Sequence, residues 1–373
     1  MHVVNKNVPP VKPVDGNLNI MQALRGLFCL VVIITHVTIN SIEHLHRDFL
    51  FNVSLFGSAA VDFFFVVSGF MITYTSIKNA GRPDKLKIFY RRRLVKIFPI
   101  YWIIITFFLV GQLLFRSFYN TPFEFTLSNV LSTYFLLPGH TMVNGVSWTL
   151  TFELYFYLLF SLFFLVRKKE WIYKGFAIYT IAIVSFGIAG FDANENVWIK
   201  LILSPVNIEI YLGMLAGAIV SKIKVQYSFY ILGVGAFLLT VSAILTNNGY
   251  HLFLNDFNRL LLFGVPSFFI ILGVSTYETN YYVGANKTLL LLGDASYSLY
   301  LLHLPFVAAF VKLYPIINIQ NDWVYHILWF FLILLVCLLS VKVYQMVELP
   351  LIKKLNSQLS PRRVNSIETI NKI

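Results

Sequence analysis

The chain has 373 residues, of which 58% are hydrophobic and 12% are charged, and its mean hydropathy is +0.72. Soluble domains are about half apolar and about one-quarter charged, so this composition excludes a soluble globular protein and indicates an integral membrane protein. The net charge of +12 lies mostly in short loops. We therefore interpret it as a signal of membrane topology, and we expect no nucleic-acid binding.

The first part of the chain, residues 1–19, is polar and contains three prolines. It lacks the apolar core of a cleavable signal, so the first apolar run is expected to direct insertion and stay in place. We expect residues 1–19 to be a cytoplasmic segment, residues 20–346 to form one transmembrane domain and residues 347–373 to be a cytoplasmic tail. Cys29 and Cys337 lie in apolar runs without zinc or redox spacing, which argues against a disulfide framework.

Windows of about 20 apolar residues, enough to cross about 30 Å of hydrocarbon, predict an all-α polytopic membrane protein. Ten spans are predicted, at residues 20–40, 55–77, 97–116, 147–167, 174–191, 199–220, 227–246, 257–275, 288–310 and 323–346. Residues 130–138 are apolar but too short to span. We expect them to re-enter the membrane or to lie in its interface.

The distribution of Lys and Arg orients these spans. If the N-terminus is cytoplasmic, residues 78–96 place eight basic residues inside and residues 167–174 place four there. On the other side, residues 117–146 contain no Lys or Arg. The bias predicts that both termini are cytoplasmic.

Ionisable side chains within spans usually face a bundle interior or a wet cavity, because a charge at the bilayer centre costs about 2.5 to 3.5 kcal/mol on insertion scales. The predicted spans contain Arg25, His36, Asp62, Glu153, Glu209, Asp294 and His303. In the first span, eleven steps of about 100° bring Arg25 and His36 onto one helix face, about 16 Å apart. A snorkelling arginine and an interfacial histidine are the ordinary alternative.

The predicted helix directions place His36, Asp62, Glu153 and His303 in one layer of the outer half of the membrane. General-base chemistry needs a histidine close to a carboxylate, since the carboxylate fixes the tautomer and stabilises the imidazolium. We therefore predict His36, Glu153 and Asp62 as catalytic candidates. Structural hydrogen bonds between helices are the alternative.

A basic cluster, Arg91, Arg92, Arg93 and Lys96, precedes Pro99 on the cytoplasmic side. Positive-inside anchoring explains such clusters in many membrane proteins. A polyanionic cytosolic ligand is the other interpretation, because Arg side chains grip phosphates with two hydrogen bonds. The chain has no GxxxxGK[ST] or GxGxxG motif, so side chains would have to hold any phosphorylated ligand.

Five stretches occur in order along the chain: QALRGLFCLVVIITH, GSAAVDFFFVVSGFMI, FYRRRLVKIFPIYW, VSWTLTFELYFY and LLGDASYSLYLLH. With them the chain resembles the acyltransferase-3 family of bacterial membrane O-acyltransferases, and most of all its exopolysaccharide O-acetyltransferase branch. The resemblance runs from about residue 18 to about residue 350. It implies function for Arg25 and His36, for a Ser-Gly-Phe turn that begins at Ser68, and for Arg92 and Arg93.

The resemblance also implies function for Trp148 and for Glu153, the Glu of the Trp-Thr-Leu-x-x-Glu stretch. Lys96 departs from the family, which more often has Arg there. Lys keeps the charge but loses the two-pronged geometry, which puts a specific phosphate contact in doubt. Because only about 25 polar residues follow the last span, we expect a stand-alone membrane acyltransferase without the esterase-like C-terminal domain of some longer relatives.

The resemblance implies that acetyl-CoA, without a metal, approaches from the cytoplasm, where Arg25, Arg92 and Arg93 hold its phosphates or pantetheine arm and Ser68 lies beside them. His36 would deprotonate a hydroxyl or carry the acyl group itself. The carboxylate that orients its ring would be Glu153 or Asp62. Trp148 or Ser68 would stabilise the oxyanion, and Trp148 and His303 are predicted to contact the substrate.

The implied acceptor is a hydroxyl of an extracytoplasmic or lipid-linked saccharide, such as exopolysaccharide, capsule or lipopolysaccharide, at a bacterial inner membrane. Polar residues of the outer loop are candidates for sugar contacts, with solvated loop filler as the alternative for each: Asn120, Asn129, His140 and Asn144. A non-saccharide acceptor is a further alternative.

Two other classes of function compete with acyl transfer. A secondary transporter would use Asp62, Glu153 and His36 as a proton relay, but the chain shows no convincing inverted repeat and its basic residues gather on one side. A sensor or scaffold would leave the layer of ionisable residues unexplained.

Overall fold

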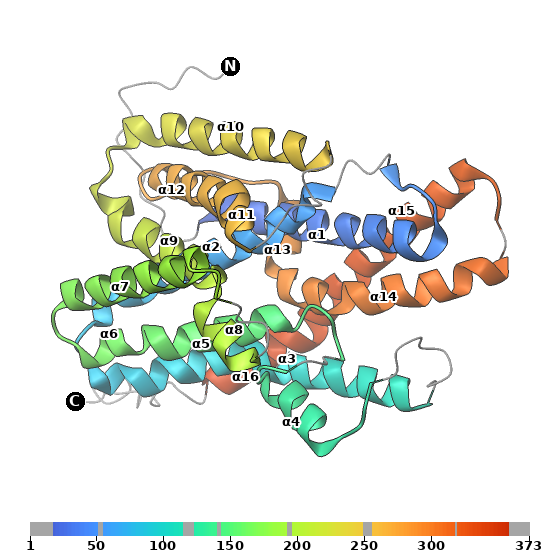
Figure 1. Cartoon of the computed structure of the whole chain (residues 1–373), viewed down its shortest axis with the longest axis horizontal. Coiled ribbons are helices and arrows are strands. Elements are labelled where there is room, and N and C mark those ends of the chain that lie inside the picture. The colour runs from blue at the N-terminus through green and yellow to red at the C-terminus, as the bar shows by residue number, and fades with distance from the viewer. Residues whose placement is uncertain are drawn as a thin grey trace, which may run out of the picture.

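The structure is a computed structural model that describes residues 18–50, 55–114, 123–139, 143–191, 196–248, 256–317 and 319–357. Within these ranges every regular element is a helix (Figure 1). The α-helices are α1 (Asn19–Leu45), α2 (Ala59–Ser76), α3 (Leu86–Leu114), α4 (Leu127–Phe135), α5 (Trp148–Phe160), α6 (Leu162–Leu165), α7 (Lys169–Ile188), α8 (Val197–Leu203), α9 (Val206–Ile219), α10 (Ser228–Asn247), α11 (Asp256–Arg259), α12 (Val265–Glu278), α13 (Lys287–Asp294), α14 (Ser296–Ile317), α15 (Asp322–Val343) and α16 (Leu349–Ser357). Two π-helical segments, η9 (Leu260–Gly264) and η10 (Tyr344–Glu348), continue α11 into α12 and α15 into α16.

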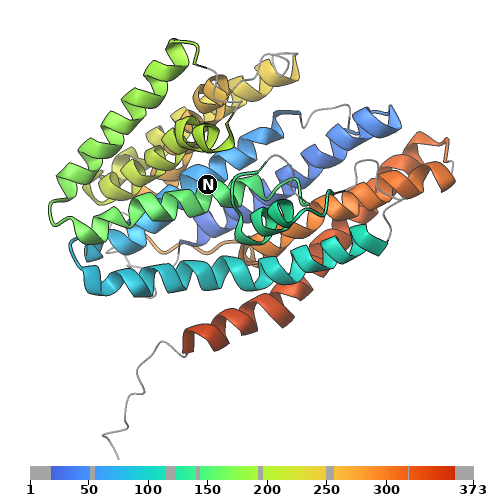
Figure 2. The ribbon, with the colours of Figure 1, turned by 60° about the horizontal axis from the view of Figure 1, so that its bottom comes forward.

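The described residues contain ten segments that are long and apolar enough to cross a membrane, which confirms the predicted number and order. These segments are Asn19–Leu45, Ala59–Asn79, Pro83–Leu114, Trp148–Leu165, Lys169–Ile188, Val197–Lys222, Val225–Asn247, Asp256–Glu278, Ser296–Ile317 and Asp322–Ser357. The long helices run in roughly one direction, with their connections at the two ends of the bundle (Figures 1 and 2). The chain is therefore a multi-pass membrane protein.

The ninth predicted span, residues 288–310, is wrong at its start. The structure places a turn at Ala295, so α13 ends at Asp294 and α14 forms the span from Ser296 onward. The short helix α13 packs tightly on α1, where a Cβ at Gly293 would collide with the carbonyl oxygen of Gln22. Asp294 is consequently not inside a span, and its exposed carboxylate accepts a hydrogen bond from Gln22 Nε2 at 2.6 Å.

Glycines allow α2 and α9 to pack closely against each other. A Cβ at Gly69 would collide with the carbonyl oxygen of Ile210, and a Cβ at Gly213 would collide with that of Val66. Small residues allow helix backbones to approach in this way. The predicted Ser-Gly-Phe turn is therefore wrong: residues 68–70 lie inside α2, and Gly69 serves a helix contact.

The connections that carry most basic residues lie at one end of the bundle, which we call the basic end. There Gly81 N donates to Phe163 O at 2.8 Å, which joins the loop before α3 to the short helix α6 that follows α5. At the same end Glu278, at the end of α12, accepts hydrogen bonds from Ile20 N and Met21 N at the start of α1. A carboxylate at a helix N-terminus satisfies donors that have no partner within the helix.

Two further segments, residues 127–135 and the end of the last span, are helical where the apolar windows predicted no span. Residues 127–135 form the short helix α4, which α3 holds through hydrogen bonds from Tyr101 Oη to Thr133 O and from Trp102 Nε1 to Tyr134 O. The last span continues through η10 and α16 to Ser357, and Glu348 on it is only 3% exposed.

Candidate active site

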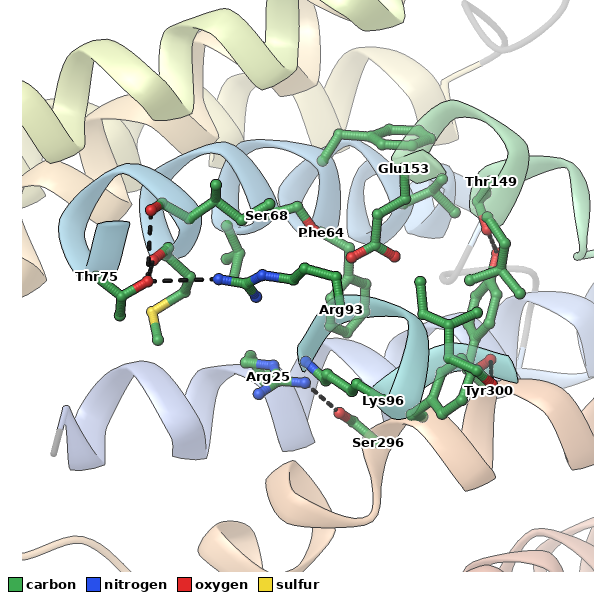
Figure 3. A pocket seen from close by; sticks show the side chains of 18 residues that line it. Arg25, Phe64, Ser68, Thr75, Arg93, Lys96, Thr149, Glu153, Ser296 and Tyr300 are labelled. Carbon is green, nitrogen blue, oxygen red and sulfur yellow. Dashed lines mark hydrogen bonds between the residues drawn. The ribbon is translucent and has the colours of Figure 1, made fainter. Parts of the chain in front are cut away.

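A cavity of about 180 Å³ opens among α1, α2, α3, α5 and α14 (Figure 3). Its polar lining comes from helices far apart in the sequence: Arg25, Ser68, Thr75, Arg93, Lys96, Thr149, Glu153, Ser296, Tyr297 and Tyr300. Four of the predicted site residues, Arg25, Ser68, Arg93 and Glu153, thus lie around one space. We call it the central cavity.

Three cationic side chains converge on the central cavity (Figure 3). Arg25 donates hydrogen bonds to Gln22 Oε1 and to Ser296 Oγ, both at 2.9 Å. Arg93 lies 3.4 Å from Thr75 Oγ1, and its guanidinium is 5.8 Å from the ring centroid of Tyr157. Lys96 follows Arg93 by three residues on α3, so both side chains face the same side of that helix.

One carboxylate, Glu153, lines the same cavity and accepts a hydrogen bond from Tyr157 Oη one turn along α5. A second carboxylate, Glu348, is buried nearby, accepts a hydrogen bond from Ser298 Oγ at 2.5 Å and interacts electrostatically with Lys96 and Arg25. Three cations therefore face two carboxylates. In the described part of the chain, all ion pairs within 4.0 Å involve other carboxylates. The central cavity thus has an excess of positive charge, which favours an anionic ligand.

A second cavity, of about 530 Å³, adjoins the first at the basic end and shares Thr75 and Arg93 with it. Its other lining residues are Ser76, Lys78, Asn79, Lys85, Ile88, Phe89, Arg92 and Phe164. Arg92 therefore belongs to this outer space, which we call the basic cavity, and is not part of the central one. The two cavities are therefore neighbours, with Thr75 and Arg93 lining both of them.

His36 and His303 line neither cavity and contact each other, with His36 Nδ1 3.4 Å from His303 Nε2. His36 on α1 is half-buried, and His303 on α14 is fully buried. Each ring also meets the carbonyl one turn earlier on its own helix: His36 Nδ1 is 2.9 Å from Val32 O, and His303 Nδ1 is 3.3 Å from Leu299 O.

Tyr300 connects the central cavity to the histidine pair. It lines the cavity, and its ring centroid is 5.8 Å from that of His303. Its Oη lies 3.1 Å from Thr149 Oγ1 and 3.3 Å from Val146 O, so it is anchored to the start of α5. The histidine pair therefore lies one side chain beyond the wall of the cavity.

The expected hydrogen bond from His36 to a carboxylate does not occur among the described residues. Asp62 lies in the first turn of α2 and pairs with Arg259 at 3.0 Å, beside the buried Glu209. The N-terminus of α2 and the guanidinium of Arg259 both stabilise the negative charge of Asp62. Asp62 pairs with Arg259 and does not contact the histidine. Glu153 is likewise bound to Tyr157.

The side chains of Trp148 and Asn144 both make contacts within the bundle. Trp148 packs against Phe65 and Phe152, with ring centroids 5.8 Å apart in both pairs. Asn144 is 2% exposed and donates from Nδ2 to Leu301 O at 2.9 Å, so the suggested contact with a sugar is wrong for this side chain. Asn129 Nδ2 donates to Glu124 O at 3.1 Å. Asn120 and His140 lie outside the described residues.

Several polar groups in or near the cavity were not among the predicted site residues, and Thr75, Tyr300 and Glu348 are three of them. Tyr300 stands three residues before His303 in SYSLYLLH, and residues three apart share a helix face. This spacing could have indicated that Tyr300 lies next to the predicted site residue His303. Glu348 stands at the end of the last apolar run, where it was assigned to a tail. Among the residues with described positions, no group of three or more His, Cys, Asp or Glu is arranged to hold a metal ion.

Comparison with known proteins gives one family. The model of the family described as "Acyltransferase domain" matches residues 18–344. The exopolysaccharide production protein ExoZ of Rhizobium meliloti is 28% identical over 319 residues, which cover 80% of this chain and 90% of ExoZ. The O-acetyltransferase OatA of Staphylococcus aureus is 27% identical over 356 residues, 84% of this chain and 55% of OatA.

The acyltransferase MdmB of Streptomyces mycarofaciens is 29% identical over 194 residues, which cover 46% of this chain and 48% of MdmB. The matched regions thus span about half the length of OatA and of MdmB, and nearly the full length of ExoZ. No solved structure matches the chain.

Proposed function

Because the chain belongs to the acyltransferase-3 family of membrane O-acyltransferases, we propose that it transfers an acetyl group from cytoplasmic acetyl-CoA to a hydroxyl of an extracytoplasmic or lipid-linked saccharide. The names of ExoZ and OatA, an exopolysaccharide production protein and an O-acetyltransferase, support this choice of acceptor and group. The observation that best supports acetyl-CoA as the donor is the excess of positive charge in the central cavity, since CoA is a polyanion with a long neutral arm.

The two neighbouring cavities suit the two parts of that donor. The basic cavity, with Lys78, Lys85 and Arg92, would hold the phosphates of the nucleotide. The central cavity would hold the pantetheine arm, with Arg25 and Lys96 available to the phosphate nearest the arm. This arrangement requires the basic end to be cytoplasmic, as the positive-inside bias predicts.

His36 is the proposed base. Its Nδ1 meets Val32 O, an acceptor only, so Nδ1 carries the proton and Nε2 keeps its lone pair. As the acceptor oxygen attacks the thioester carbonyl, His36 Nε2 takes the hydroxyl proton. The carbon–sulfur bond then breaks, and the CoA thiolate leaves and takes that proton. If an acyl-enzyme forms, the same nitrogen carries the acyl group.

The positions of Arg25 and His36 on α1 allow one residue to bind the donor and the other to act as the base. They lie about 16 Å apart on one helix face, so a bound donor can have its charge near Arg25 and its thioester near the histidine pair. Tyr300, which is hydrogen-bonded to Thr149, lines the side of the central cavity next to the histidine pair. Ser68 lines the wall formed by α2.

The transporter alternative receives no support from these contacts. A relay through Asp62, Glu153 and His36 needs them connected, whereas their hydrogen bonds in the described structure go to Arg259, Tyr157 and to Val32 and His303.

Mass spectrometry of the surface polysaccharide tests the proposal. Host cells with the wild-type protein are expected to produce sugar units that carry one extra acetyl group, and cells without it, or with His36→Ala, are expected to lack them. Immunoblots of the membrane fraction verify that the variant inserts. Identical spectra with and without the wild-type protein would overturn the proposed acceptor.

A further inference from the structure

We propose that His303 is a positioning residue for His36, and that its neutral imidazole takes the place that a carboxylate occupies in a Ser-His-Asp triad. This inference rests on the proposed function, in which His36 is the base. It starts from the contact between the two rings, 3.4 Å from His36 Nδ1 to His303 Nε2. Neither Asp62 nor Glu153 is hydrogen-bonded to His36, so His303 is the side chain that meets its Nδ1.

The backbone carbonyls around the pair fix where the ring protons lie. Val32 O and Leu299 O can only accept, so the Nδ1 atoms of His36 and His303 that face them must both carry hydrogen. His303 Nε2 then has a lone pair directed at the Nδ1–H of His36, which is shared between Val32 O and His303. In this arrangement His36 Nδ1 donates to Val32 O and His303 Nε2, and His303 Nδ1 donates to Leu299 O. The lone pair of His36 Nε2 is then available to accept a proton.

The surrounding fold holds His303 in this orientation. His303 is 0% exposed, and the ring of Tyr300 packs beside it. Pro305 has no N–H to donate to Leu301 O, four residues earlier. Asn144 Nδ2 supplies that hydrogen bond at 2.9 Å, which ties the loop before α5 to α14 next to His303.

The position of His303 matters most when His36 accepts a proton. The positive charge that forms on the His36 ring is shared by its Nδ1–H, which then has two acceptors, Val32 O and His303 Nε2. A neutral acceptor stabilises this charge less than a carboxylate does. It adds no buried negative charge when His36 is neutral, which suits an apolar region.

Three substitutions at residue 303 separate positioning from packing. His303→Gln can place an oxygen acceptor near the position of Nε2. His303→Asn is the matched control, because its shorter side chain reaches the position of Nδ1 and Leu299 O but not His36. His303→Leu removes both hydrogen bonds and keeps the bulk.

Purified variants are assayed for acetyl transfer from acetyl-CoA, with kcat and KM determined separately and thermal unfolding measured in the same detergent. We expect His303→Leu and His303→Asn to lower kcat about 10- to 100-fold, as loss of an orienting partner commonly does, with KM for acetyl-CoA unchanged. His303→Gln is expected to restore kcat to within about fivefold of the wild type on the same grounds.

Equal kcat values for wild type and His303→Leu, or equal losses in the Gln and Asn variants at unchanged unfolding temperature, would overturn the positioning role and leave the acyl-transfer proposal standing. An inactive wild-type protein would instead remove the proposed function.

Discussion

Arg25 Nη2 donates a hydrogen bond to Ser296 Oγ at 2.9 Å, at the point where α14 begins. Eleven residues later α1 meets α14 again, through the contact of His36 with His303. One pair of helices thus positions both the cationic cavity and the histidine pair. Their spacing is set by α-helix geometry, so a shift in this helix pair would disturb both sites together.

Replacing Arg25 is expected to weaken donor binding. Arg25→Ala should raise KM for acetyl-CoA about 10- to 100-fold, because a charge-assisted hydrogen bond contributes about 1.5 to 3 kcal/mol. Arg25→Lys keeps the charge but loses the second donor, and an intermediate KM is expected. Steady-state kinetics on purified protein measure both values.

The control for this substitution is Arg82→Ala, which removes an equal charge from an exposed ion pair with Asp84 at the same end of the bundle. We expect its KM to stay within about twofold of wild type, since exposed ion pairs contribute about 0 to 1 kcal/mol. Equal KM increases in the Arg25 and Arg82 variants would mean that overall charge, and not the central cavity, determines donor binding.

Arg92 lines the basic cavity only, so its contribution should depend on the nucleotide part of the donor. Arg92→Ala is expected to raise KM for acetyl-CoA about tenfold and to leave KM for acetyl-pantetheine, which has no nucleotide, unchanged. Competition assays with the two donors measure this difference. An identical increase for both donors would contradict the assignment of the nucleotide to this cavity.

Much of the architecture was predictable from hydropathy and charge. Ten apolar windows predicted the ten spans, because the length and composition of a membrane helix are properties of a continuous segment. The periodicity of α1 also placed Arg25 and His36 on one face. Both are local properties that one helix determines alone.

Contacts between helices were not predictable in the same way. Depth in the membrane grouped Asp62 with His36, but Asp62 pairs with Arg259, which directly precedes the π-helical segment η9 that packs against α2. Glu348 was assigned to a tail because the apolar run ends there, although the helix continues and buries it. Equal depth leaves the rotation and the neighbours of each helix undetermined.

The pairing of Asp62 with Arg259 predicts a role in stability. Asp62→Asn leaves the guanidinium without its buried partner and is expected to lower the free energy of unfolding by about 3 kcal/mol, the low end for such pairs because Arg259 is partly exposed. Thermal unfolding in detergent measures the loss, with Asp84→Asn in an exposed pair as the control. Folded Asp62→Asn protein that has lost activity at unchanged stability would point instead to a catalytic role.

The contact between α2 and α9 predicts a different response from two glycines. Gly69→Ala is expected to destabilise the protein by about 1 to 3 kcal/mol, because the added methyl group has no space against the backbone of α9. Gly175→Ala in α7 is the matched control, with no atom within 4 Å of the new Cβ, and is expected to be neutral or stabilising by up to about 1 kcal/mol. Equal unfolding temperatures for the two variants would rule out a packing role for Gly69.

The most direct measurement is acetyl transfer by purified protein in liposomes supplied with labelled acetyl-CoA and a saccharide acceptor. We expect the wild-type protein to label the acceptor and release CoA in equal amounts. His36→Ala should lower the rate by about 100-fold or more, the usual range for loss of a general base, while the variant still binds acetyl-CoA. Transfer by His36→Ala at the wild-type rate, or no transfer by the wild-type protein, would contradict the proposed reaction.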